Sequence, residues 1–171
     1  MLFRSFLSGD AERAVELLAR AAAYQTGQGK ALSLYYRGAI LNRSGRYEQA
    51  LLSLDQSLAE RPDLILAREE RGESLWLLGR RPEAIAAWSD AVKGNLDIVL
   101  ANNMLAGAYA SQGKMEDALA YAKQADQSTP PDPRFHWMVA LRLQNVGMNS
   151  LAEKHFSRAI QLDPKFQSRR R

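Results

Sequence analysis

Few side chains in this sequence have the types and spacing that catalysis would require. The best pair of carboxylates is Glu69 and Glu73, four residues apart on one face of an expected helix, with Glu70 beside them. General acid–base catalysis needs one carboxyl group of such a pair to be desolvated, so that its pKa moves away from that of its neighbour. An open helical surface desolvates a carboxylate poorly. Two interpretations remain: a solvated acidic face, or a binding patch for a basic partner.

The two histidines do not form a recognisable metal-binding motif. His136 and His155 fall on different expected helices, without the spacing of a zinc-binding helix, and the sequence contains no cysteine. We expect His136 to be a buried or half-buried packing residue and His155 to lie on a helix surface. The sequence therefore predicts no catalytic residue, no metal site and no cofactor, and we expect a protein that is not an enzyme.

The net charge of +4 arises mostly from the C-terminal tail. Arg169, Arg170 and Arg171 supply three of these charges, so the preceding residues are nearly neutral. A groove for nucleic acid needs lysines and arginines clustered on one face, and the pattern does not show this. We expect no nucleic-acid partner for the body of the chain. The tail is interpreted as a solvated end, with a polyanion-binding arm as the alternative.

The composition is typical of a folded globular protein. Of the 171 residues, 46% are hydrophobic and 25% are charged, which argues against disorder. No apolar run approaches the roughly 18 to 20 residues of a membrane-spanning helix. The first seven residues are too short and too interrupted for a secretory signal. The expected localisation is the cytoplasm, with the periplasm or a complex-associated location left open.

Internal repetition is the strongest signal in the sequence. Glycines recur with a period of 34 residues at Gly45, Gly79, Gly113 and Gly147. The same period relates three sets of small residues: Gly38, Gly72, Ala106 and Ala140; Ala50, Ala84, Ala118 and Ala152; Ser57, Ala91, Ala125 and Ala159. Prolines close three of the units, and Gly94-Asn95 is the expected stop in the unit that lacks one.

Each 34-residue unit predicts two helices. Apolar residues follow helical spacing both before and after the central glycine. The glycine can adopt the left-handed backbone conformation that ends the first helix. The small residues indicate where two helix axes approach closely, so we expect each unit to be a tightly packed helix hairpin.

The pattern resembles the tetratricopeptide repeat, a 34-residue motif with Leu-Gly, Tyr, Ala, Phe and Pro at set positions. The third repeat matches at Leu105, Ala106, Tyr109, Gly113, Ala118, Ala125 and Pro130; the fourth matches at Ala140, Leu143, Gly147, Ala152, Phe156, Ala159 and Pro164. The resemblance covers a single domain with a half repeat at about 1–26, full repeats at about 31–64, 65–98, 99–132 and 133–166, and a basic tail at 167–171. It implies an all-α, right-handed superhelical solenoid of antiparallel helix hairpins.

The resemblance also implies a binding groove, because members of this family hold peptides on one face of the first helix of each repeat. The corresponding positions here are Tyr35, Asn42, Arg43, Glu69, Glu73, Trp76, Asn103, Trp137, Leu141 and Gln144. Aromatic side chains among amide and charged groups are typical of protein-binding surfaces. The implied function is a non-enzymatic scaffold or adaptor whose groove binds a peptide or protein segment, one with basic residues if it meets Glu69 and Glu73.

The end of the array suggests an alternative function. Repeat arrays normally finish with a polar capping helix, and seven residues follow Pro164, too few for a full one. We therefore expect Phe156, Ala159 and Ile160 to lie exposed and to contact a partner or a second copy of the chain. The alternative is a structural or assembly subunit of a multiprotein complex that acts through its end helices and convex face, including by self-association.

Overall fold

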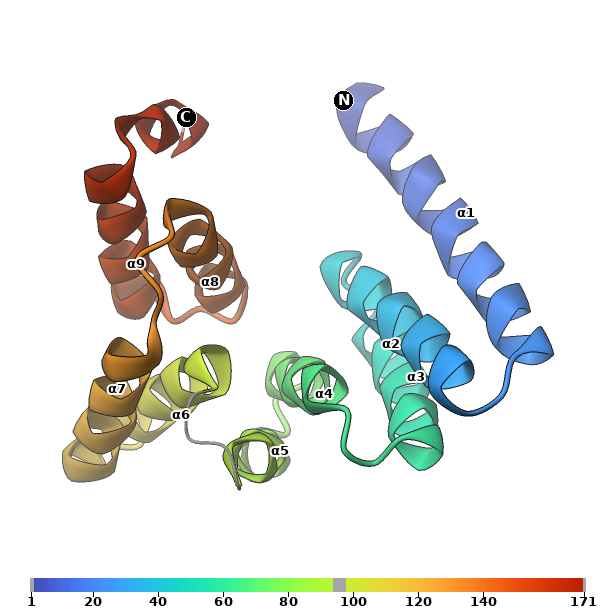
Figure 1. The fold of residues 1–171 in the computed structure, drawn as a ribbon, viewed down its shortest axis with the longest axis horizontal. Helices are drawn as coiled ribbons and strands as arrows, with labels where there is room; N and C mark the ends of the chain where they lie inside the picture. The colour runs from blue at the N-terminus through green and yellow to red at the C-terminus, as the bar shows by residue number, and fades with distance from the viewer. Residues whose placement is uncertain (1, 94–97, 171) are drawn as a thin grey trace. The chain divides into compact units, whose positions relative to one another are not determined.

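All regular structure in the described part of the chain is helical (Figure 1). The computed structural model describes the backbone of residues 2–93 and 98–170 and the side chains of residues 10–93 and 98–169. The helices are α1 (Leu2–Tyr24), α2 (Gly27–Arg43), α3 (Tyr47–Glu60), α4 (Ile65–Leu77), α5 (Arg81–Val92), α6 (Val99–Ser111), α7 (Met115–Ser128), α8 (Pro133–Asn145), α9 (Asn149–Leu162) and the 3-10 helix η1 (Pro164–Arg170). This confirms the all-α fold class. The expected stop at Gly94-Asn95 and the final arginine lie outside the described residues.

The chain divides into two compact units, Met1–Ala87 and Trp88–Arg171, with the boundary inside α5. In the first unit, α1 packs on α2, α2 pairs with α3, and α4 contacts both α2 and α3. In the second unit, α6 pairs with α7 and α8 pairs with α9, while α6 contacts α8 and η1 packs on α9. The pairs α2–α3, α6–α7 and α8–α9 are the hairpins that the repeat pattern predicts.

The turn of each hairpin is built on the periodic glycine. Gly45, Gly79, Gly113 and Gly147 have φ angles of 75°, 77°, 74° and 80°, the left-handed conformation that ends a helix. At the first of them, the Gly45 N–H donates to the Asn42 carbonyl at 3.0 Å, and the Arg46 N–H donates to the Leu41 carbonyl at 2.9 Å. These bonds satisfy carbonyl groups at the end of α2, and the prediction for these glycines is confirmed.

The small residues of the repeat lie buried in the helices, as expected for close packing. Ala50, Ala84, Ala118 and Ala152 are each 5% exposed or less. Gly38 on α2 lies so near α3 that a Cβ atom added to it would stand 2.6 Å from Cγ of Leu54. The core cluster of the first unit contains Val15, Ala31, Leu41, Ala50, Leu54, Leu64 and Ala67. The small side chains thus permit the helix contact on which this core depends.

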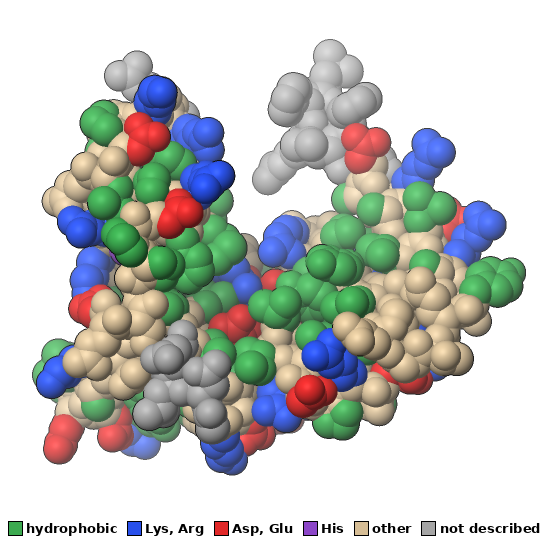
Figure 2. Space-filling model, in the orientation of Figure 1, with side chains coloured by type: hydrophobic (Ala, Val, Ile, Leu, Met, Phe, Trp, Pro, Cys, Tyr) green, Lys and Arg blue, Asp and Glu red, His purple; other side chains and the backbone are tan. Residues whose placement is uncertain are grey.

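Charged side chains of both signs are interspersed on the faces that Figure 2 shows. Several form ion pairs between neighbouring helices, including Lys30 with Glu60, Arg71 with Asp55 and Lys154 with Asp126, each at 2.6 Å. Positive charge is therefore balanced locally in both units, in agreement with the nearly neutral body of the sequence. Within the described residues, no helix combines the length and the apolar character needed to cross a bilayer.

Candidate functional site

The predicted groove residues of the first unit separate into accessible and buried side chains. Tyr35 and Trp76 are half-buried and Arg43 is exposed. The guanidinium of Arg81 lies 5.0 Å from the centroid of the Trp76 ring, which places a cation on an aromatic face. The other three predicted residues, Asn42, Glu69 and Glu73, are buried. The accessible part of this prediction is therefore Tyr35, Arg43 and Trp76.

The buried Asn42 joins α2 to α4. Its Nδ2 donates to the backbone carbonyl and to Oε2 of Glu70, both at 3.0 Å, and its Oδ1 accepts from the Ser74 hydroxyl at 2.7 Å. Nη2 of Arg43 lies 3.5 Å from the other carboxylate oxygen of Glu70. Because buried polar groups need hydrogen-bond partners, these contacts give Asn42 a structural role between the two helices.

The interpretation of the acidic cluster as a solvated face is wrong. Glu69, Glu70 and Glu73 are 5%, 1% and 4% exposed. The face of α4 is not open, because α4 contacts both α2 and α3 within the first unit. These carboxylates therefore do not offer an exposed acidic patch to a basic partner.

In the second unit, the accessible predicted residues lie on α8. Leu141 is 47% exposed and Gln144 is exposed, while Trp137 is half-buried. The centroid of the Trp137 ring lies 4.8 Å from that of Phe156 and 5.4 Å from that of Phe166, so the indole also packs within this unit. Met138, which the groove prediction did not include, is 45% exposed and stands three residues before Leu141, a spacing that places both on one helix face. We call Trp137, Met138, Leu141 and Gln144 the α8 stripe.

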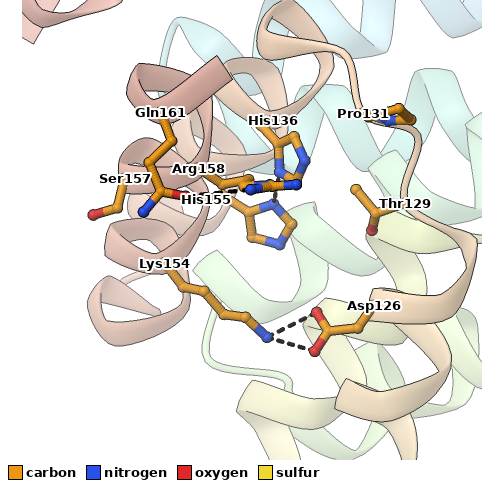
Figure 3. A pocket seen from close by; sticks show the side chains of 9 residues that line it. All are labelled: Asp126, Thr129, Pro131, His136, Lys154, His155, Ser157, Arg158 and Gln161. Atoms are coloured by element: carbon orange, nitrogen blue, oxygen red, sulfur yellow. Dashed lines mark hydrogen bonds and ion pairs between the residues drawn. The ribbon is translucent and has the colours of Figure 1, made fainter. Parts of the chain in front are cut away.

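Asn103, predicted to line the groove, instead contacts a buried pair of histidines. Its Nδ2 donates to the Val99 carbonyl at 2.9 Å, and its Oδ1 lies 3.3 Å from Nε2 of His155. Nδ1 of His155 lies 3.0 Å from Nδ1 of His136, and Figure 3 shows the two rings facing each other. Asn103 is buried as well.

The prediction of a buried or half-buried His136 is confirmed, whereas the prediction of an exposed His155 is wrong. His155 is 3% exposed, because the face of α9 that carries it is turned inward. Ala152, Phe156 and Ala159 are buried on the same face. This helical spacing was the signal that could have identified His155 as buried.

Burial lowers the pKa of both histidines. It lowers the pKa of His155 to about 4, and the neighbouring His136 and Lys154 act in the same direction, while Asp126 opposes them. For His136, burial is the largest cause of the lowered pKa, followed by the positive charge of Arg158. Both rings are therefore neutral at pH 7, and one must donate a proton to the hydrogen bond while the other accepts it.

The free energy of unfolding is expected to fall as the pH drops from the ordinary histidine pKa of 6.5 towards about 4. In this window the unfolded chain binds a proton at His155 that the folded chain does not bind, which favours unfolding. Urea denaturation at a series of pH values measures the slope. His155→Gln is expected to flatten the profile in this window, and an unchanged slope in that variant would contradict the assignment.

The histidine pair opens onto a pocket of about 480 Å³ within the second unit (Figure 3). The pocket is lined by Asp126, Thr129, Pro131, His136, Lys154, His155, Ser157, Arg158 and Gln161. Nζ of Lys154 contacts both carboxylate oxygens of Asp126, at 2.7 and 2.6 Å, and the exposed Arg158 donates to Oε1 of Gln161 at 3.3 Å. Among the side chains that the structure describes, no three metal-ligating groups come together.

The expectation of an exposed C-terminal end is wrong for Phe156 and Ala159. Both are buried, and Ile160 is half-buried. The residues after α9 form η1, which packs on α9 and places the buried Phe166 beside Trp137. The Arg169 guanidinium lies 4.5 Å from the centroid of the Phe166 ring. The short 3-10 helix thus packs one aromatic side chain against α8 and α9.

Comparison with known proteins agrees with this architecture. The family model described as tetratricopeptide repeat matches residues 8–65 and 69–133, more than half of the chain. No curated protein matches the sequence.

Among solved structures, a crystal structure of MamA is 19% identical with a TM-score of 0.65, the alignment covering 96% of this chain and 95% of that one. MamA from Desulfovibrio magneticus RS-1 is 21% identical with a TM-score of 0.62, covering 95% and 90%. TTC0263, a thermophilic TPR protein of Thermus thermophilus, is 19% identical with a TM-score of 0.68, covering 98% and 92%. At these identities the likeness concerns the fold.

Proposed function

Since the chain belongs to the tetratricopeptide repeat family, we propose that it is a protein-interaction scaffold without catalytic activity. Repeat arrays of this kind present the faces of successive helices as extended binding surfaces. The observation that carries the proposal for this chain is the exposed apolar pair Met138 and Leu141 on α8, the first helix of a repeat. Exposed apolar side chains on such a face supply the contact area that a partner buries.

The proposed ligand is an extended peptide segment with apolar side chains that pack on the α8 stripe. Leu141 and Met138 provide apolar contact, and the exposed amide of Gln144 is available to hydrogen-bond the peptide backbone. Tyr35, Arg43 and Trp76 form a second proposed contact region on the first unit. Because Glu69 and Glu73 are buried, the interaction is expected to depend on apolar contact more than on salt concentration.

Leu141→Glu is expected to weaken binding of the natural partner about ten-fold, equivalent to about 1.4 kcal/mol. The substitution places a charge where the partner would bury an apolar side chain. Partners retained from an extract of the native cells would be identified by mass spectrometry, and the affinity of the purified partner would then be measured by calorimetry.

The matched control is Leu119→Glu on α7. Leu119 is 66% exposed and also belongs to the second unit, but it lies on the second helix of its repeat. We expect the control variant to bind like the wild type. Equal losses in the two variants, or undiminished binding by Leu141→Glu, would contradict a binding site on the α8 stripe.

The alternative, an assembly subunit that acts through its end helices and convex face, has less support at its C-terminal end. It requires the apolar residues of α9 to be available, but Phe156 and Ala159 are buried and η1 packs on α9. The apolar side chains that are exposed on α8 therefore favour the peptide-binding interpretation.

A further inference from the structure

The hydrogen bonds around the histidine pair determine which ring nitrogens carry protons. Asn103 donates through Nδ2 to the Val99 carbonyl, so its Oδ1 is the atom that faces His155 and must accept a hydrogen bond. Nε2 of His155 therefore carries a proton. Because the ring is neutral, its Nδ1 has a free lone pair, and Nδ1 of His136 must donate to it. Nε2 of His136 is then left without a proton.

This unprotonated nitrogen belongs to a side chain that is more than nine-tenths buried and lines the pocket. No described residue donates a hydrogen bond to Nε2 of His136; the single hydrogen bond of this ring is made by Nδ1. The nitrogen is a strong acceptor, and a ligand in the pocket can satisfy it by donating a proton.

The charges of the pocket favour an anion. Lys154 is neutralised by Asp126, with which it forms a close ion pair. Arg158 forms a hydrogen bond with the neutral amide of Gln161, so the pocket keeps one net positive charge. Figure 3 shows the Arg158 side chain extending towards the two rings. This cation beside the histidines disfavours a metal ion and favours an acidic group.

We propose that this pocket binds a phosphate group that still carries a proton. The P–O–H group of the phosphate donates a hydrogen bond to Nε2 of His136, and the guanidinium of Arg158 donates to the anionic oxygens. The pocket would thereby distinguish phosphate from sulfate, because sulfate has no proton to donate. The site is formed by α7, α8 and α9 of the second unit, and it is separate from the residues to which peptide binding is assigned. The proposal therefore goes beyond the scaffold function and does not depend on it.

The phosphate could be free hydrogen phosphate or a phosphate monoester, and pH separates these two sources. At pH 7.5 hydrogen phosphate keeps its proton, whereas a monoester, whose second pKa is about 6, has lost it. At pH 5.5 the monoester regains the proton. Burial lowers the pKa of His136, and the positive charges of Arg158 and Lys154 on α9 act in the same direction, whereas Asp126 on α7 and Asp132 at the start of α8 oppose them.

The experiment is a titration of the full chain with inorganic phosphate, sulfate or N-acetyl-O-phosphoserine amide at constant ionic strength, followed by the imidazole ¹⁵N shifts of His136 and His155. At pH 7.5 we expect phosphate to produce saturable shifts. Sulfate and phosphoserine should bind about ten-fold more weakly than phosphate, because each lacks the proton for one hydrogen bond to His136. At pH 5.5 phosphoserine should gain affinity and sulfate should not. Phosphoserine binding at pH 5.5 at least as tight as that of free phosphate would identify a monoester as the ligand, and weaker binding would identify free phosphate.

Arg158→Gln should weaken phosphate binding about ten-fold or more, as for a lost charge-assisted contact. Lys123→Gln, an exposed lysine on α7 outside the pocket, is the matched control and should bind like the wild type. The proposal would be overturned by equal affinities for phosphate and sulfate at pH 7.5. It would also be overturned if sulfate gained as much affinity at pH 5.5 as phosphoserine does, or if the Arg158 and Lys123 substitutions had equal effects. Both variants change exposed side chains, and circular dichroism verifies that they remain folded.

Discussion

Replacing Leu54 with alanine is expected to lower the free energy of unfolding of the protein by about 2 to 5 kcal/mol. Leu54 on α3 is completely buried and belongs to the core cluster of the first unit, together with Leu41 and Ala50. The Leu54 side chain also packs against Gly38 on α2. Because Gly38 has no side chain, it cannot fill the space that truncation of Leu54 would leave. Urea denaturation followed by circular dichroism measures the loss.

Leu52 provides the matched control on the same helix. It stands two residues before Leu54 and is 59% exposed, so Leu52→Ala removes the same atoms from a position that contributes little to the core. We expect this variant to differ from the wild type by no more than about 0.5 kcal/mol. Similar losses in both variants would show that the α2–α3 contact does not depend on Leu54.

The helix hairpins could be predicted from the sequence because their determinants are local and periodic. A glycine every 34 residues indicated the turns, and the φ angles of Gly45 and Gly147 confirm the left-handed conformation. Trp88 stands one 34-residue period after Leu54, and both side chains are completely buried. Repeats strengthen such predictions, because each repeat independently shows the same type of residue at the same position.

The buried polar residues could not be predicted in the same way. Helical periodicity assigns a residue to a face, but it does not say what covers that face, and polar residues are usually exposed. Asn42 finds its partner Glu70 28 residues away, and His155 contacts Asn103 across 52 residues. Such contacts depend on how the repeats stack. This is why His155 and Glu69 were expected at the surface and are instead buried.

The C-terminal end illustrates a second limit of sequence reasoning. The residues after Pro164 were too few for a complete capping helix, and the expectation of an exposed end followed from that count. A single 3-10 helix places one aromatic ring, Phe166, against Trp137, and this contact needs far fewer residues than an α-helix. A segment too short for a complete capping helix can therefore still pack an aromatic ring against α8.

Gly38→Ala is expected to lower the free energy of unfolding by about 1 to 3 kcal/mol. In an exposed helix interior the same substitution stabilises by roughly 0.5 to 1 kcal/mol, so the expected sign is reversed. The added Cβ would stand 2.6 and 2.8 Å from Cγ and Cδ2 of Leu54, and 3.3 Å from the Ala50 carbonyl oxygen. Leu54 is completely buried and the Ala50 oxygen belongs to the backbone, so the two helices must move apart.

Gly107→Ala on α6 is the matched control for this effect. Its added Cβ would also meet a neighbour, but that neighbour is the flexible end of the Met148 side chain, which can change rotamer. We therefore expect a clearly smaller loss at Gly107 than at Gly38, measured by urea denaturation in the same buffer. An equal or larger loss at Gly107 would show that side-chain flexibility does not govern the cost of these substitutions.

A double-mutant cycle tests whether the clash with Leu54 is the cause. Leu54→Ala removes the Cγ and Cδ2 atoms that the new methyl group would meet, leaving the 3.3 Å contact with the Ala50 carbonyl as the closest approach. The double variant Gly38→Ala/Leu54→Ala should therefore lose about 1 to 2 kcal/mol less than the sum of the single losses, within the range seen for residues in direct contact. Additive losses would mean that Gly38 is required for some other reason, such as the approach of the two backbones. A favourable coupling would show that the small residue Gly38 and the large residue Leu54 of this hairpin act as one packing unit.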